Sequence, residues 1–97
     1  MKYSLLMLKN SCACKLFMPY HWTMDNGGVN LDEYETVYTG HIEPNAMVDA
    51  TLEDIFVMFN LNRPDDYRGR SMSVSDLVVL EETDTYYCDS VGFKKIE

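Results

Sequence analysis

A run of four consecutive apolar residues at positions 77–80, Leu-Val-Val-Leu, constrains the fold of this 97-residue chain more than any other feature. Apolar side chains at successive positions fit a strand that is covered on both faces, and such a strand lies in the interior of a sheet. The surrounding residues predict a strand over 74–80 and, after a turn, an antiparallel partner over 85–88. After a short interruption, residues 93–96 predict an edge strand. The chain is therefore expected to fold around a sheet whose central strand is 74–80.

One helix is predicted over residues 51–60. Its apolar side chains recur at positions i, i+3, i+4 and i+7 and so share one helical face. These side chains are Leu52, Ile55, Phe56 and Phe59. Thr51 followed by Asp54 resembles a capping box and predicts the start of the helix, and Pro64 prevents the helix from continuing through it. We expect this helix to pack its apolar face against the sheet.

The N-terminal half of the chain predicts two further strands. Residues 2–9 have apolar side chains on both faces, and residues 35–42 are rich in β-branched and aromatic residues. The second strand alternates irregularly, and we place three of the side chains at its start on one face: Tyr34, Thr36 and Tyr38. Residues 10–15 are predicted as an irregular connection and residues 16–18 as a short strand. Residues 20–28 fit either a short helical turn closed by glycines or an aromatic-rich loop.

These elements define the α+β class, with a small, mostly antiparallel sheet and one main helix packed on it. The length suits one hydrophobic core, and no repeat or linker-like segment divides the sequence, so we expect a single domain over residues 1–97. No apolar stretch reaches the roughly 20 residues of a membrane-spanning helix. The N-terminus lacks the longer apolar region and cleavage site of a secretory signal. We therefore expect a cytoplasmic protein.

Charge is distributed unevenly along the chain. The net charge is −8, and residues 16–62 contain eight acids and no lysine or arginine. Phosphate binding needs clustered cations, so direct nucleic-acid binding is disfavoured. A protein partner with a basic surface is electrostatically compatible, whereas an acidic surface that only maintains solubility is the simpler alternative. The acids expected to face such a partner are Asp32, Glu33, Glu35 and Glu43.

The three cysteines predict neither a disulfide framework nor a metal centre. Their number is odd, and Cys12 and Cys14 form a C-x-C pair, whereas structural zinc sites usually combine C-x-x-C pairs into four ligands. Cys88 lies in a predicted strand and is expected to be buried and reduced. No P-loop, dinucleotide-binding, metalloprotease or nucleophile-elbow motif is present, so we expect no cofactor.

All three arginines of the chain lie within eight positions. They are Arg63, Arg68 and Arg70. Such a concentration is suited to recognition of a carboxylate or phosphate, but ion pairing with the neighbouring acids is the favoured interpretation. In particular, Asp66 is expected to pair with Arg68 or Arg70, or to cap a turn after Pro64.

Three serines at alternate positions follow the arginines: Ser71, Ser73 and Ser75. Their spacing predicts an extended segment with its hydroxyl groups on one face. A serine nucleophile needs a base within hydrogen-bonding reach, and nothing in the sequence ties His21 or His41 to this segment. Hydrogen bonds between Ser73 and Ser75 and backbone groups, where the loop enters the strand, are the favoured interpretation.

Residues 51–96 resemble the YodL-like domain family. The shared pattern is a helix, an F-N pair, a turn with proline, a G-[HR]-S-[LM]-S-V-S-D-[VIL]-V segment and a Y-Y-x-D-S-x-G-F segment. It is carried by Phe59, Asn60, Pro64, Asp66, Gly69, Arg70, Ser71, Ser73, Val74, Ser75, Asp76, Tyr86, Tyr87, Asp89, Ser90, Gly92 and Phe93. Relatives often have histidine where this chain has Arg70. The resemblance implies a protein from a mobile element of Firmicutes, often a conjugative transposon, and implies no particular activity.

The same motifs supply the candidate binding residues. These are Arg63, Asp66, Arg70, Ser71, Ser73, Asp76, Tyr86, Asp89 and Ser90. An arrangement of these side chains around one exposed cleft would favour a site. Side chains that are consumed by bonds inside the fold would instead make the motif a folding signature, which is the favoured interpretation.

Two hypotheses about function follow. The first is a non-enzymatic protein-interaction module of a bacterial mobile genetic element, acting as an acidic inhibitor of a host-defence or nucleic-acid-binding protein. The alternative is a small-ligand or peptide-binding domain, with or without catalysis, whose pocket lies at the Asp66–Asp89 motif. A nucleic-acid module is a third hypothesis because the serine-rich segment is similar to PUA-like strands, but the net charge opposes it.

Overall fold

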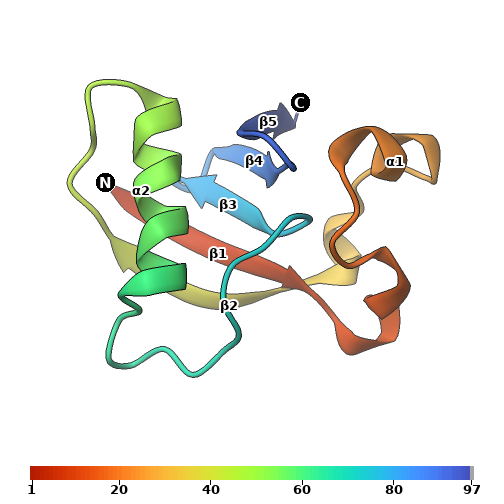
Figure 1. Ribbon diagram of the computed structural model, residues 1–97, viewed down its shortest axis with the longest axis horizontal. Helices are drawn as coiled ribbons and strands as arrows, with labels where there is room; N and C mark the ends of the chain where they lie inside the picture. The colour runs from red at the N-terminus through yellow and green to blue at the C-terminus, as the bar shows by residue number, and fades with distance from the viewer. Residues whose placement is uncertain (97) are drawn as a thin grey trace.

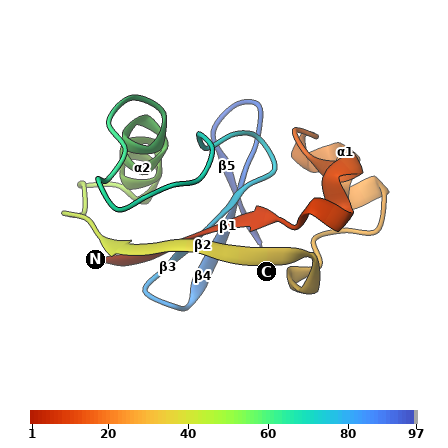
Figure 2. The same cartoon turned by 90° about the horizontal axis from the view of Figure 1, so that it is seen from below.

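The computed structural model describes residues 1–96 and contains one five-stranded antiparallel sheet. In spatial order its strands are β2 (Tyr34–His41), β1 (Lys2–Leu8), β3 (Leu77–Leu80), β4 (Asp84–Cys88) and β5 (Phe93–Ile96). The main helix, α2 (Val48–Leu61), crosses one face of the sheet, and the segment between β1 and β2 lies at one end of it (Figure 1, Figure 2). The predicted α+β class is confirmed, and β3 occupies the central position that its apolar run predicts.

Helix α2 buries the apolar face that its sequence predicts. Leu52, Ile55 and Phe59 are completely buried, and they share one cluster with Leu5 of β1 and Val78 of β3. Burial of each such side chain contributes about 1.5–3 kcal/mol, whereas helix propensities differ by only about 0.7 kcal/mol per residue. Packing against the sheet, rather than propensity, therefore stabilises α2.

Phe59 is the centre of an aromatic cluster on this face. Its ring lies edge-on to three tyrosine rings, with centroid distances of 6.1 Å to Tyr3, 5.5 Å to Tyr38 and 4.9 Å to Tyr67. These residues come from β1, β2, α2 and the loop after α2. The edge-to-face geometry is favourable beyond the area that it buries, so the cluster joins four parts of the chain.

The opposite face of the sheet has a smaller buried cluster. It consists of Leu8, Tyr34, Leu77 and Tyr87. The segment between β1 and β2 packs against it through residues that include Leu16 and Tyr20. Strand β1 is therefore covered on both faces, as its sequence predicts, because Leu5 faces α2 and Leu8 faces this second cluster.

A β-bulge in β2 explains its irregular alternation. Leu5 pairs with Tyr38 and Leu6 pairs with Thr36, so Val37 has no partner in β1. The extra residue reverses the faces of the side chains on its two sides. Tyr38 packs in the cluster under α2, whereas Tyr34 is buried on the opposite face. The prediction that Tyr34 and Tyr38 share a face is therefore wrong.

The segment between β1 and β2 contains three short helices rather than a strand. They are the 3-10 helices η1 (Asn10–Lys15) and η2 (Leu31–Glu33) and the α-helix α1 (Tyr20–Asp25). The predicted strand at 16–18 is absent because Phe17 has a φ of +66° and its amide donates to Ser75 Oγ (3.1 Å) instead of to a strand. The helical alternative for residues 20–28 is correct, and α1 is followed by Gly27 at a φ of +103°.

Helix α2 begins three residues before the predicted start. Thr51 lies inside the helix, is buried, and does not cap it. Its hydroxyl accepts a hydrogen bond from the Asn45 amide (2.8 Å) and donates one to the Met47 carbonyl (3.3 Å). The hydroxyl therefore holds the loop before the helix, which allows the helix to start at Val48.

Truncation of Phe59 tests the contact between α2 and the sheet. We expect Phe59→Ala to lower the free energy of unfolding by about 3–5 kcal/mol because it leaves a cavity among three aromatic rings. Val57→Ala, on the exposed side of the same helix, is the matched control, and we expect it to change stability by about 0.5 kcal/mol or less. Urea unfolding measures both, and equal effects of the two substitutions would contradict this packing.

Candidate functional site

Asp76 is completely buried immediately before β3 and forms a bidentate ion pair with Arg70. The distances are 2.6 Å from Nη2 to Oδ1 and 3.0 Å from Nη1 to Oδ2. The Ser73 amide donates a third hydrogen bond to Oδ2 (2.8 Å). Burial raises the pKa of Asp76, and the bonds from Arg70 and Ser73 oppose this rise. The carboxylate is therefore occupied within the fold.

Ser75 links three separate segments of the chain. Its hydroxyl accepts from the Phe17 amide, its carbonyl accepts from the Tyr34 hydroxyl (2.9 Å), and its amide donates to the Cys88 carbonyl (2.9 Å). The Cys88 amide in turn donates to the Asp76 carbonyl (2.9 Å). These bonds join β2, β4 and the segment before α1 at one point.

The backbone conformation at Ser75 shows that two predictions from sequence are wrong. Ser75 has a φ of +86°, so residues 74–76 form a turn, and β3 begins at Leu77 rather than at residue 74. Ser71, Ser73 and Ser75 therefore do not form an extended segment with their hydroxyl groups on one face. The physical reason is the buried hydroxyl of Ser75, which is held by the Phe17 amide.

The loop between α2 and β3 is held by hydrogen bonds from side chains to backbone carbonyls. The Tyr67 hydroxyl donates to the Arg70 carbonyl (2.6 Å). A Cβ at Gly69 would lie 2.3 Å from the Tyr67 hydroxyl oxygen, which explains glycine at this position. Arg63 donates to the Gly69 carbonyl (3.2 Å), and Arg68 donates to the carbonyl of Asp65 (2.6 Å). Each arginine of the cluster therefore makes a bond within the fold.

Asp66 does not pair with an arginine. Its Oδ1 accepts a hydrogen bond from the Tyr38 hydroxyl (2.9 Å), which connects the loop to β2. The predicted pairing with Arg68 or Arg70 is wrong because Arg70 turns inward to Asp76 and Arg68 reaches a backbone carbonyl.

The Y-Y-x-D-S motif attaches the segment containing α1 to the sheet. The Tyr87 hydroxyl donates to the Met18 carbonyl (2.6 Å) and lies 2.7 Å from the Thr23 hydroxyl. Oδ1 of Asp89 accepts from the amides of Tyr20 (3.0 Å) and Ser90 (2.8 Å). Tyr86 is buried on the other face, in the cluster under α2.

The candidate residues therefore occupy several places rather than one exposed cleft. Arg70, Ser73 and Asp76 come together, and Ser71 joins them through its carbonyl, which accepts from Arg70. The remaining candidates lie elsewhere: Arg63 and Asp66 in the loop after α2, Tyr86 in the core, and Asp89 and Ser90 beyond the end of β4.

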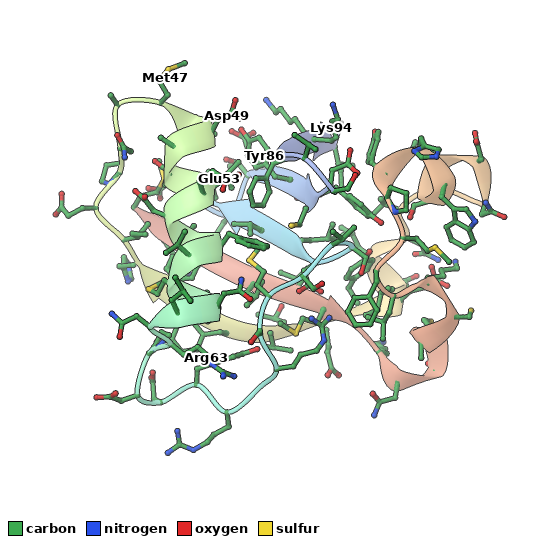
Figure 3. The ribbon with its side chains drawn as sticks, in the orientation of Figure 1. Met47, Asp49, Glu53, Arg63, Tyr86 and Lys94 are labelled. Carbon is green, nitrogen blue, oxygen red and sulfur yellow. The ribbon has the colours of Figure 1, made fainter. Side chains whose placement is uncertain are left out.

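A hollow of about 130 Å³, which we call the Glu53–Asp89 hollow, lies between α2 and the turn from β4 to β5. It is lined by Glu53, Phe56, Cys88, Asp89, Ser90, Gly92 and Phe93. Figure 3 shows Glu53 on α2, with Tyr86 and Lys94 on the neighbouring strands. Sequence analysis identified Asp89 and Ser90 as binding candidates but missed Glu53, whose only signal is its place three residues before Phe56.

A second, more apolar hollow of about 300 Å³ opens near the other cluster and is lined by Val29, Leu31, Thr85 and Ile96. Among residues 1–96, no group of three or more His, Cys, Asp or Glu side chains is placed to hold a metal ion. No helix in this part of the chain is both long and apolar enough to cross a membrane.

N-terminal lysines approach two of the acids expected to face a partner. Lys15 Nζ lies 2.8 Å and 2.9 Å from the two carboxylate oxygens of Glu33, and this bond lowers the pKa of Glu33. Lys9 Nζ donates to the carbonyl of Asp32 (2.9 Å). The side chains of Asp32, Glu35 and Glu43 are exposed.

Helix α2 has three exposed acids and no compensating cation. These are Asp49, Glu53 and Asp54. The ion pairs among the described residues are Lys2–Glu82, Lys15–Glu33, Arg70–Asp76 and Lys95–Asp84, and none includes α2. Helix α2 therefore carries an acidic surface that no ion pair within residues 1–96 compensates.

Comparison with known families gives one match, in which the family described as the YodL-like domain covers residues 2–97. None of the curated proteins and none of the solved structures matches the chain. The match includes the N-terminal half, which the sequence motifs alone connect to the family only loosely.

Removal of Arg70 tests whether the motif stabilises the fold. We expect Arg70→Ala to lower the free energy of unfolding at neutral pH by about 3–5 kcal/mol because it leaves the buried Asp76 carboxylate without its counterion. Arg63→Ala removes one exposed bond to a carbonyl and is the control, with an expected change of about 0.5 kcal/mol or less.

The pH dependence of the stability lost in Arg70→Ala provides a second test. A group whose pKa is higher in the folded state stabilises the fold when protonated and loses this contribution as the pH rises. Loss of Arg70 raises the pKa of Asp76 further, so the stability deficit should narrow as the pH falls from 7 towards 5. A loss of stability that is the same at pH 7 and pH 5 would show that the substitution does not act through the Asp76 carboxylate.

Thiol labelling tests the placement of the three cysteines. Burial, with nearby carboxylates, raises the pKa of Cys88 to about 12, whereas Cys14 is exposed. We therefore expect iodoacetamide at pH 8 to alkylate Cys14 in the folded protein and to spare Cys88. Peptide mass mapping measures the labelling, with denatured protein as the control in which every cysteine reacts. Equal rates at Cys14 and Cys88 in the folded protein would contradict the placement.

Proposed function

The chain belongs to the YodL-like domain family, and on this premise we propose that it is a non-enzymatic protein-interaction module of a bacterial mobile genetic element. Its partner presents a basic surface with apolar side chains. The internal bonds of the motif support the absence of catalysis. Ser75, Asp76 and Arg70 are committed to one another or to backbone groups, and a nucleophile needs a free base beside it.

The exposed side of α2 is the observation that carries the proposal. Two large apolar side chains remain in solvent on this side, with exposed fractions of 48% for Val57 and 82% for Leu61. Val57 and Leu61 are four residues apart and lie on the side opposite the buried Ile55 and Phe59. Exposed apolar side chains that cluster on one element mark interaction surfaces.

The negative charge of the same surface favours a partner with a basic surface. Asp49, Glu53 and Asp54 flank the exposed apolar side chains, and α2 contains no lysine or arginine. An acidic rim attracts a basic partner and repels nucleic acid and acidic proteins. Basic grooves that bind nucleic acid in other proteins have the complementary charge, so inhibition of such a protein is the favoured role.

The pairing of Glu33 with Lys15 changes the expected contact surface. Of the four acids assigned to the partner from sequence, only Glu33 has its carboxylate paired, with Lys15, whereas Lys9 bonds the backbone carbonyl of Asp32. We therefore place the main contact on α2 and treat Glu35 and Glu43 as its periphery. The small-ligand alternative places its pocket at the Asp66–Asp89 motif, and it is less well supported because the hollow there, at about 130 Å³, is smaller than the roughly 300–1,000 Å³ of typical ligand pockets. The hollow of about 300 Å³ is lined by none of the motif residues.

A matched pair of charge insertions tests this proposal. Val57 on α2 and Met24 on α1 are both 48% exposed. We expect Val57→Arg to weaken partner binding by about tenfold or more, because it places a like charge and a bulky side chain inside the contact, and Met24→Arg to leave binding unchanged. Isothermal titration with the purified partner measures the dissociation constant.

The partner for this titration comes from cross-linking of the full chain in bacterial lysate, followed by purification of each candidate. A one-to-one complex that weakens with salt and with Val57→Arg alone supports the proposal. A partner that binds both variants equally, or the absence of any salt-sensitive partner, contradicts it. Retained amide dispersion in the NMR spectra of both variants ensures that unfolding does not explain the result.

A further inference from the structure

We infer that the Glu53–Asp89 hollow receives one cationic side chain, lysine or arginine, from the partner. This inference rests on the proposed function and adds the point at which the basic partner is anchored. The hollow is lined by residues of α2 and of the turn from β4 to β5, next to the proposed contact surface. Figure 3 labels Glu53, the residue of α2 that begins this lining.

The size of the hollow selects a single side chain. Its volume of about 130 Å³ is well below the roughly 300–1,000 Å³ of pockets that enclose a whole small-molecule ligand. A nucleotide or a drug-sized molecule needs a larger pocket. The end of one long side chain that projects from a partner surface fits this space.

Two residues with carboxylate side chains line the hollow, one from α2 and one from the turn after β4. Glu53 is exposed on α2, and Asp89 follows β4. The hydrogen bonds that Asp89 accepts from described residues, from the amides of Tyr20 and Ser90, both end on Oδ1, which leaves Oδ2 for a ligand. A cation in the hollow would be bordered by both acidic residues, since Glu53 and Asp89 both line it.

The carboxyl group of Asp89 is ionised at its position in the fold. Burial opposes ionisation, but the amides of Tyr20 and Ser90 outweigh it and lower the pKa of Asp89, with smaller contributions from Lys94 and His21. Lys94 and His21 are exposed and make no ion pair with Asp89. The hollow therefore keeps a negative charge at neutral pH.

The remaining walls also favour a cation. Phe56 and Phe93 are half-buried and line the hollow from α2 and β5, and aromatic rings attract cations through their faces. Cys88 borders the hollow as a neutral thiol, because burial and the negative charges of Asp76, Glu53 and Asp89 raise its pKa to about 12. The same charges that disfavour a thiolate favour a bound cation.

A metal ion is a poorer occupant than an organic cation. Calcium takes six to eight oxygen ligands, and among residues 1–96 no group of three or more metal-ligating side chains is assembled here or elsewhere. Two carboxylates with two aromatic rings match an ammonium or guanidinium group, which needs charge and an apolar wall for its methylene stem.

An NMR titration of the full chain tests the inference with n-butylammonium and n-butylguanidinium as probes and neutral n-butanol as control. We expect the amides of Glu53, Ser90, Gly92 and Phe93 to shift with the cations and not with butanol. The relative response to the two cations distinguishes lysine from arginine as the natural anchor.

Two neutral substitutions on α2 provide the matched comparison. We expect Glu53→Gln to weaken binding of the cations about two- to fivefold, the range for a partly exposed charge, and Asp49→Asn to leave it unchanged. Asp49 is an exposed acid four residues earlier on the same helix and does not line the hollow. Substitution of Asp89 is avoided because Asp89 also holds α1.

Three results would overturn the inference: equal shifts with butanol, equal weakening by both substitutions, or shifts spread over all exposed acids. A partner that requires Val57 but binds the Glu53→Gln variant with unchanged affinity would also overturn it, and would leave the proposed function intact. Conversely, selective binding of the cations without any salt-sensitive partner would support the hollow and contradict the proposed function.

Discussion

The buried carboxylate of Asp76 is the constraint on which the rest of the structure depends. A charge in the protein interior costs several kcal/mol unless it is paired and hydrogen-bonded. Arg70 and the Ser73 amide supply these bonds, and together they fix the path of residues 70–76. The path requires a positive φ at Ser75, which directs the chain into β3 at the centre of the sheet. The position of the apolar central strand therefore depends on one polar contact beside it.

Contacts at and near this turn account for several residues of the family motif. Gly69 is needed because Tyr67 lies against it, and Ser75 and Asp89 accept backbone amides from the segment between β1 and β2. Three polar residues of the motif, Ser75, Tyr87 and Asp89, thus attach an irregular N-terminal segment to the sheet, and Arg70 and Asp76 are bonded to each other. A motif consumed in this way leaves the surface, and above all the acidic exposed side of α2, as the place where this chain meets other molecules.

Elements with strong local periodicity were predictable from the sequence, and elements set by tertiary contacts were not. The central strand and α2 follow from spacing alone, because apolar side chains at fixed intervals allow few arrangements. The bulge at Val37, the true start of α2 and the turn at Ser75 each depend on a partner distant in sequence, such as the Phe17 amide for Ser75. The motif residues were identified as important, but their pairing was not, because Asp66 is closer than Asp76 to the arginines in the sequence, whereas in the fold Arg70 pairs with Asp76. Glu53 was missed because its place three residues before Phe56 does not reveal which strand lies beside that face of the helix.

Native-state hydrogen exchange at the amides of Phe17, Tyr20, Ser75 and Cys88 tests the central claim most directly. These amides donate the bonds that join the turn, β4 and the N-terminal segment. If the turn around Asp76 holds the fold together, they exchange only through global unfolding, with the same protection free energy as the amides of β1 and β3. Exchange of these four amides through local opening, while the sheet remains protected, would contradict the account.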